Sequence, residues 1–274
     1  MIQHLGWKTG SPDGDQAPHL SPLQLTVRQA TSAQLKGTTI AGRIRALSRF
    51  IVSTGNPPSP TNMRCLRVNL AKLWDMPWEP YNKETLWRLI NNGVSGAGGH
   101  DTINPHPCPC GWAPPSTTTG DPSSTITHCD AWRAHAFWTC PVAQAVVGEI
   151  MEATSLPINM QNIWLLHPPT MSPYPIDPGL WLPVAAAALS AMHHGRKVMY
   201  ATNKTSVTPP PQTPFIDRRT SQVAISKFWT LLQDFADCAQ PAASDTPRGH
   251  PFFQVRHGCV SLQPPPIRLP ADLD

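Results

Sequence analysis

Four residues near the middle of the chain have the types and the spacing of a structural zinc site. Cys108 and Cys110 flank Pro109 and are followed by a glycine, and four residues separate His135 from Cys140. Zinc prefers thiolate and imidazole ligands, and four of them close a tetrahedral site that keeps no open position for chemistry. The sequence therefore predicts a structural Zn²⁺ ion held by Cys108, Cys110, His135 and Cys140.

Two features of this stretch leave other ligand sets open. Residues 114–127 are rich in Ser, Thr, Gly and Pro and predict a loop between the two pairs. His128 and Cys129 stand at the end of that loop and compete as alternative metal ligands. One residue separates Cys108 from Cys110, whereas zinc sites more often use about two to four. Without a metal, the cysteines would be free thiols and the histidine a surface residue.

No residues suited to catalysis emerge from the same pattern. A polymerase needs paired aspartates for two metal ions, and the nearest imitation, residues 235–238, has one aspartate inside a helical pattern. His128 and Cys129 are chain neighbours, and such neighbours rarely form a nucleophilic pair. The His-Glu-x-x-His motif of a catalytic zinc is missing from the sequence. We therefore predict no catalytic residue and no enzymatic activity.

The two halves of the metal site must be positioned by helices. A helix that includes or flanks residues 132–147 would place His135 and Cys140 about one turn apart and let them converge on one ion. Pro141 fits the first turn of a helix that runs to about Thr154.

Apolar residues at helical spacing predict the other helices. They are expected from Thr31 or Ser32 to about Val52, over 66–74, from Lys83 to Asn92 with Asn82 as N-cap, over 179–201, and from Thr220 or Ser221 to about Cys238. Residues 250–262 predict a short hairpin. The 33 prolines interrupt regular structure. The expected fold class is mainly α, with short helices and proline-rich connections around a small zinc-binding module.

Positive charge is concentrated in residues 28–88, where ten Lys or Arg face three acidic residues, although the whole chain carries only +4. A localised basic segment suits a polyanion such as nucleic acid; a solvated helix face is the alternative interpretation. The side chains expected to contact phosphates are Arg43, Arg45, Arg49, Arg64, Arg67 and Arg88. Trp74, Trp78 and Trp87 would either stack on unpaired bases or pack in the core.

The cysteine count and the N-terminus indicate a reducing compartment. Seven cysteines are an odd number, and no positive-then-apolar signal segment opens the chain. The longest apolar run, residues 180–192, is too short to span a bilayer. We expect a soluble intracellular protein, nuclear or cytoplasmic, with no membrane partner.

Three motifs in residues 70–150 share the order of one known module. The first is a Trp-rich segment, residues 73–78, before a helix that contains Trp-Arg-Leu and ends at Gly93. The second is the pair of cysteines with the glycine that follows them. The third is His135, four residues and Cys140, followed by an apolar helix. This order resembles the zinc-binding segment C-terminal to the polymerase in non-LTR (LINE-type) retrotransposon reverse transcriptases. That family often has an acidic residue where this chain has Trp132, and its insert before the histidine is shorter. Residues 188–197 and 250–253 resemble C-terminal extensions of such elements in green algae.

The resemblance implies a role for the module. Its metal ligands would be Cys108, Cys110, His135 and Cys140. Its partners would be RNA or DNA and a reverse transcriptase polymerase domain, which it would help to grip template RNA or target DNA. The expected division of the chain is a loosely ordered arm (1–30), a basic amphipathic helix and linker (31–60), the zinc-binding domain (61–155), a helical C-terminal extension (156–262) and a mobile tail (263–274).

Two further interpretations remain. The chain would be a zinc-stapled helical scaffold that binds protein in a ribonucleoprotein assembly, or a decayed retroelement fragment. Strong salt dependence of RNA or DNA binding favours the nucleic-acid-binding interpretation, since contacts to phosphates release counterions. Binding that survives high salt favours the scaffold.

Overall fold

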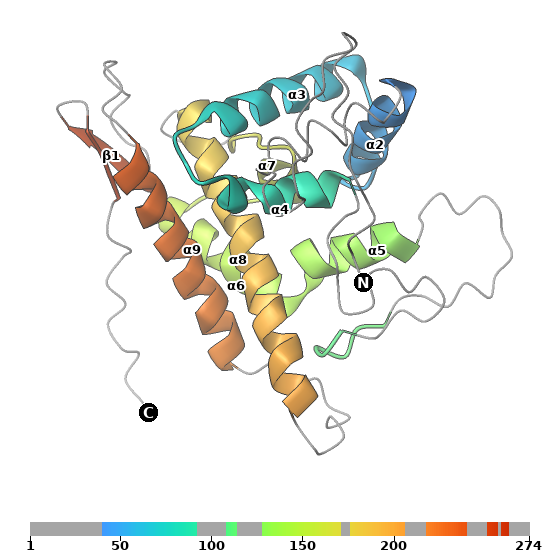
Figure 1. Ribbon diagram of the computed structural model, residues 1–274, viewed down its shortest axis with the longest axis vertical. Coiled ribbons are helices and arrows are strands. Elements are labelled where there is room, and N and C mark those ends of the chain that lie inside the picture. The colour runs from blue at the N-terminus through green and yellow to red at the C-terminus, as the bar shows by residue number, and fades with distance from the viewer. Residues whose placement is uncertain are drawn as a thin grey trace, which may run out of the picture.

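A single long helix, α8 (Pro178–Thr205), runs through the middle of the computed structural model (Figure 1). The structure describes residues 40–91, 108–113, 128–170, 176–205, 218–239, 251–256 and 259–262. Every residue of α8 from Trp181 to Leu189 is buried. The predicted helix over 179–201 is confirmed, and its central position follows from its composition, because a helix that is apolar all round must be enclosed by others.

The other elements are short, and the predicted mainly α fold is confirmed. In chain order they are α2 (Ile40–Val52), α3 (Pro60–Asp75), α4 (Pro80–Ile90), α5 (His128–Ala134), the π-helical turn η1 (His135–Thr139), α6 (Pro141–Thr154), α7 (Met160–Trp164), α9 (Arg218–Cys238), β1 (Phe253–Arg256) and β2 (Cys259–Leu262). The two strands pair antiparallel, with Phe253 opposite Leu262, as the sequence predicts for 250–262. Within the described ranges, no helix has both the length and the apolar character needed to cross a bilayer.

α8 is enclosed by helices from both ends of the chain. α9 and α6 pack along one side of it, while α4, α3 and α7 cover other sides (Figure 1). Gly195 lies where α8, α9 and α6 approach each other: a Cβ built there would be 2.7 Å from the Cβ of Ala224 and 2.7 Å from Cγ1 of Val142. Only glycine permits this spacing, so the three helices meet closely at this point.

Two helix starts differ from the predicted ones. α3 begins at Pro60, ahead of the expected 66, because the hydroxyl of Ser59 accepts a backbone N–H of the first turn and a proline suits position N1. The prediction of Asn82 as an N-cap is wrong. α4 begins at Pro80 with Glu79 at the cap position, and Asn82 is buried inside the helix. The proline at N1 decides the start here, too.

α9 also begins earlier than expected. It starts at Arg218, so Thr220 is buried within the first turn and is not its cap. The predicted start of the first helix, Thr31 or Ser32, lies outside the described residues; α2 is described from Ile40. The end of α9 at Cys238 agrees with the prediction.

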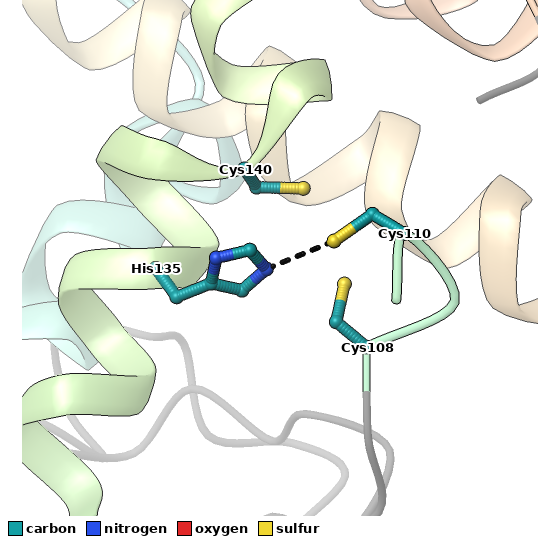
Figure 2. A group of neighbouring side chains, drawn as sticks. All are labelled: Cys108, Cys110, His135 and Cys140. Atoms are coloured by element: carbon teal, nitrogen blue, oxygen red, sulfur yellow. Dashed lines mark hydrogen bonds between the residues drawn. The ribbon is translucent and has the colours of Figure 1, made fainter. Parts of the chain in front are cut away.

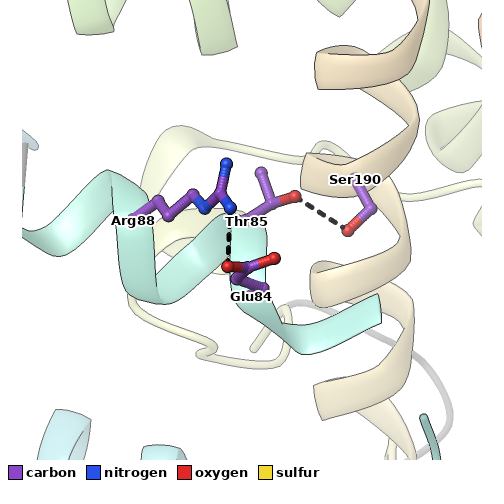
Figure 3. A network of polar contacts seen from close by, with 4 residues as sticks. All are labelled: Glu84, Thr85, Arg88 and Ser190. Atoms are coloured by element: carbon purple, nitrogen blue, oxygen red, sulfur yellow. Dashed lines mark hydrogen bonds and ion pairs between the residues drawn. The ribbon is translucent and has the colours of Figure 1, made fainter. Parts of the chain in front are cut away.

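Polar contacts fix α4 between α3 and α8. The ammonium of Lys83 donates to the carbonyl oxygens of Trp74 and Met76, at 3.1 and 2.7 Å, where α3 ends. On the other side, Ser190 of α8 and Thr85 of α4 have their hydroxyl oxygens 3.2 Å apart (Figure 3). Because burial lowers the pKa of Lys83, these carbonyls are the compensating partners of a partly desolvated ammonium group.

Candidate metal centre

The structure brings together the four residues that the sequence pattern selects. Cys108 and Cys110 come from the loop 108–113, His135 from η1, and Cys140 is the residue before α6 (Figure 2). One ligand atom from each, three Sγ atoms and an imidazole nitrogen, lie within 4.8 Å of one another, and all four residues are buried. Residues separated by up to 32 positions along the chain thus point at a common centre.

The π-helical turn explains how His135 and Cys140 converge. In an α-helix, residues five apart differ by about 140° in direction. Here the backbone N–H of Cys140 donates to the carbonyl of His135 at 2.7 Å, the i to i+5 bond of a π-helix. One π turn therefore stacks the two side chains on one face. Pro141 then starts α6, with Cys140 as its extended N-cap residue.

A tight turn sets the direction of the other two thiols. The N–H of Gly111 donates to the carbonyl of Cys108 at 2.8 Å, and the N–H of Cys108 donates to the carbonyl of Trp112 at 2.7 Å. Gly111 has φ +91°, a conformation that side chains with a Cβ rarely adopt. The turn compensates for the short Cys-Pro-Cys spacing, because it folds both sulfur atoms to the same side.

His135 presents Nε2 to the thiols. This nitrogen lies 3.2 Å from Sγ of Cys110, while Nδ1 lies 3.2 Å from the hydroxyl oxygen of Thr139. With Nδ1–H donated to Thr139, the lone pair of Nε2 is free for a metal, the arrangement in which outer partners orient ligating imidazoles. The indole of Trp112 stacks on the imidazole at 4.3 Å, nearly parallel, and holds the ring in place.

Electrostatics among the three thiols favour a cation at their centre. Hydrogen bonds from Cys108 and then Cys140 hold the pKa of Cys110 well below its ordinary value. The same contacts raise the pKa of Cys108, chiefly through Cys110, and that of Cys140, chiefly through Cys108. One thiolate is thus stabilised by two thiols, and a second would repel it. A divalent ion among them would lower the raised pKa values of Cys108 and Cys140, because a metal ion deprotonates a thiol that coordinates it.

The donor set fits a small tetrahedral metal ion. A metal–sulfur bond of about 2.3 Å places tetrahedral ligand atoms about 3.8 Å apart, so a spacing of up to 4.8 Å needs only a slight contraction. Four protein ligands occupy every position. Such an ion would link the loop 108–113 to the helical segment 128–154.

A buried cation that the sequence pattern did not single out accompanies the site. Arg196 of α8 is only 3% exposed, and its guanidinium carbon lies 4.3 Å from the ring centroid of Trp132. It also lies 5.8 Å from the ring of Tyr200. Burial, and next the neighbouring Cys108, raise the pKa of Tyr200 to about 12. Three thiolates, one imidazole and a divalent ion would carry one net negative charge. Arg196 is a buried cation in the same neighbourhood, because the charges of Cys108 and Arg196 both act on Tyr200.

Helix α4 positions the helical half of the site through one contact. Nη1 of Arg133 donates to the carbonyl oxygen of Leu89 at 3.0 Å, at the end of α4. α5 is thereby joined to the α4–α8 layer. His128 and Cys129, the alternative ligands, are the first residues of α5, but their side chains lie outside the described part of the structure.

The arginines expected to contact nucleic acid lie on the helices remote from the metal centre. Four are exposed on α2 and α3: Arg45, Arg49, Arg64 and Arg67. The side chain of Arg43 is outside the described residues. Arg88 differs, because its Nη2 lies 2.7 Å from Oε1 of Glu84 in an ion pair one turn apart on α4 (Figure 3).

The tryptophans of the lead-in divide between core and margin. Trp78 is 4% exposed and meets the ring of Phe235 edge-on at 5.7 Å, which makes it a core residue. Trp74 is half-buried below the ammonium of Lys83. Trp87 is also half-buried. None of these three tryptophan side chains is fully exposed, so none offers its whole ring to a base for stacking.

The comparisons with known proteins gave no relative: no family model, no curated protein and no solved structure matches the chain.

Proposed function

We propose that the chain is a zinc-stabilised nucleic-acid-binding module without a reaction of its own, of the kind that follows the polymerase in non-LTR retrotransposon reverse transcriptases. The buried set of Cys108, Cys110, His135 and Cys140 is the observation that carries the proposal. In this role the module assists a polymerase domain by binding template RNA or target DNA.

Zinc is the metal that this donor set suits best. Three sulfur donors and one imidazole select soft or borderline ions over Mg²⁺ or Ca²⁺, which prefer oxygen. Zn²⁺ accepts tetrahedral coordination by Cys₃His and needs no further ligand in a structural role. The ion would contribute to folding and would supply no chemistry, because four protein groups fill its coordination sphere.

The exposed face of α2 and α3 supports a polyanionic partner. Of the residues that the structure describes, no acidic side chain pairs with any of four guanidinium groups there. These groups belong to Arg45, Arg49, Arg64 and Arg67. Exposed cations gathered on two adjacent helices attract phosphates and release their counterions on binding.

Salt-dependent titration tests the nucleic-acid part. Zinc per chain is first measured by elemental analysis, with one ion expected. Fluorescence anisotropy with single-stranded RNA and duplex DNA then gives affinity against salt. Each phosphate contact contributes about 0.7 to the slope on a single strand, so replacing the four arginines by Gln should reduce it by up to about 3. Arg88→Gln is the matched control, because its ion pair with Glu84 already engages the charge. An unchanged slope in the fourfold variant would refute the proposal.

One observation favours the second candidate, a protein-binding scaffold. Ile44, Val52 and Val68 are 45–48% exposed on the same two helices that carry the arginines. Exposed apolar side chains on a surface suit a protein partner. Binding of a polymerase domain that persists at high salt, together with no RNA or DNA binding, would establish this function in place of the first.

A further inference from the structure

The hydroxyl group of Tyr200, near the end of α8, is a buried donor close to the metal centre. Within the described part of the chain, its oxygen is enclosed by protein and has no hydrogen-bond partner. Buried hydroxyl groups are nearly always hydrogen-bonded, because an unpaired one has lost its bonds to water without replacing them. An acceptor for this O–H must therefore come from the groups around it.

Two side chains of opposite chemistry are near this hydroxyl. After burial, which is the largest influence, the pKa of Tyr200 is raised by Cys108, in the loop 108–113, and lowered by Arg196, one turn earlier on α8. The guanidinium carbon of Arg196 is 5.8 Å from the centroid of the tyrosine ring. Among the described residues, neither side chain reaches the geometry of a full hydrogen bond with the hydroxyl. Tyr200 is thus a common neighbour of a ligand sulfur and a buried cation.

The donor and acceptor roles of these three groups favour one arrangement. A guanidinium group only donates, and Nε and Nη1 of Arg196 are buried with no partner among the described residues. Arg196 can therefore bond only to the phenolic oxygen of Tyr200, which leaves the O–H free to donate elsewhere. A neutral thiol is a weak acceptor, whereas a thiolate that holds a metal ion is an ionised one and accepts a stronger, charge-assisted bond.

We propose that Tyr200 is a positioning residue of the metal centre, whose O–H donates to Sγ of Cys108 when that sulfur coordinates the ion. Arg196 donates in turn to the phenolic oxygen and orients it. A phenol keeps its proton at neutral pH and so remains a donor. The inference rests on the proposed zinc site and adds to it a residue of α8, so that the loop 108–113 is joined to the central helix as well as to the segment 128–154.

Tyr200→Phe removes the hydroxyl group and keeps the ring. Zinc affinity of the full-length chain is measured by competition with a chelator, and we expect it to weaken about 10–100-fold, as on loss of other outer partners of metal ligands. Tyr81→Phe is the matched control, because it removes the same group from an exposed tyrosine of α4 and should leave the affinity unchanged. Equal zinc affinity of the wild type and Tyr200→Phe would overturn the proposal.

Cobalt substitution separates this role from a packing role. Co²⁺ bound by cysteine sulfur absorbs in the near ultraviolet through charge transfer from the thiolate, and a hydrogen bond to the sulfur raises the energy of this band because it stabilises the sulfur lone pairs. We expect the band to move to longer wavelength in Tyr200→Phe and to stay in place in Tyr81→Phe. An unmoved band in Tyr200→Phe refutes the donor role even if the affinity falls.

A double variant tests the part assigned to Arg196. If Arg196 acts through Tyr200, the chain with both Arg196→Met and Tyr200→Phe should lose less zinc affinity than the two single losses combined. Strictly additive losses would show that Arg196 does not orient the hydroxyl. A wild-type chain that binds neither Zn²⁺ nor Co²⁺ would instead refute the proposed zinc site, and this inference with it, which is a different result from a missing effect of Tyr200 alone.

Discussion

Replacing Cys140 by Ser tests the metal centre most directly. Cys140 is fully buried and contributes one of three thiols to the four-ligand set. Serine keeps the size and the N-cap position before Pro141 but removes the thiolate. We expect the variant to lose zinc, because a hydroxyl is a poor ligand for this ion in a sulfur-rich site.

The expected magnitude follows from the number of ligands. A structural zinc ion contributes about 10–16 kcal/mol in small metal-dependent folds, or roughly 2.5–4 kcal/mol for each of four ligands if they share it equally. One ligand thus corresponds to about 10²–10³ in affinity. At fixed free zinc, the free energy of unfolding should fall by a similar amount. The loss should be greatest in the loop 108–113, which the metal joins to segment 128–154, and smallest in α8 and α9.

Three measurements check this prediction. Elemental analysis gives zinc per chain, a competing chromophoric chelator gives affinity, and limited proteolysis follows the loop containing Cys108 and Cys110. Cys65→Ser is the matched control, since Cys65 is exposed on α3 and outside the ligand set. One zinc per chain with unchanged melting in Cys140→Ser, or equal zinc loss in Cys65→Ser, would refute the ligand assignment.

Three other substitutions probe α8. Gly195→Ala places a Cβ 2.7 Å from that of Ala224 and should lower the free energy of unfolding in urea by about 1–3 kcal/mol. Gly148→Ala is the control and should not lower it, because a Cβ at Gly148 has nothing within 4 Å. Equal stability of the two variants would contradict the close approach of the helices at Gly195. Burial holds the pKa of His193 at about 4, below its ordinary 6.5, so the unfolded chain takes up the proton first and stability falls from about pH 6.5 to 4. His193→Gln should reduce this loss of unfolding free energy by about 2 kcal/mol. If the wild type and the variant lose stability in parallel as the pH falls, this expectation is disproved. Arg196→Met should weaken zinc binding about 10–100-fold, measured by competition with a chelator, and Arg196→Lys should weaken it less because it keeps the charge. If the Met variant binds zinc with wild-type affinity, Arg196 does not compensate the charge of the site.

Helices with strong local signals were predictable from the sequence. Pro141 at N1, an apolar stripe and no internal breaker define α6, and its bounds agree with the expectation of 141–154. The alanine-rich run within residues 179–201 predicted α8 in the same way. Helix starts were harder, because Asn82 is a good cap in isolation while Pro80, two residues earlier, starts the helix. The fixed φ of proline therefore determined where α4 starts, although Asn82 has the stronger preference for the capping position.

The candidate site was predictable as a set of residues and not as a geometry. Residue types selected Cys108, Cys110, His135 and Cys140. The expectation that an ordinary helix would let the last two converge was wrong in its geometry, because an α-helix directs residues five apart about 140° from each other and the turn between them is a π-helix. The π turn that aligns them, with its i to i+5 bond from Cys140 to His135, cannot be recognised from a local sequence pattern. Arg196 was missed because it lies 56 residues beyond Cys140. An arginine four residues before a tyrosine in an apolar helix is the only trace of it.

Adjacent residues of α8 contact different neighbours. Successive side chains on a helix differ by about 100° in direction. His193 accordingly stacks on Phe137, which belongs to the metal-binding turn, at 6.2 Å, while His194 lies on the side that faces α9, near Lys227. Arg196 lies over the rings of Trp132 and Phe137 on the same side as His193. The two faces of α8 are thus separate, so a substitution at His194 should leave the packing beside the metal-binding turn intact, whereas a substitution at His193 should disturb it.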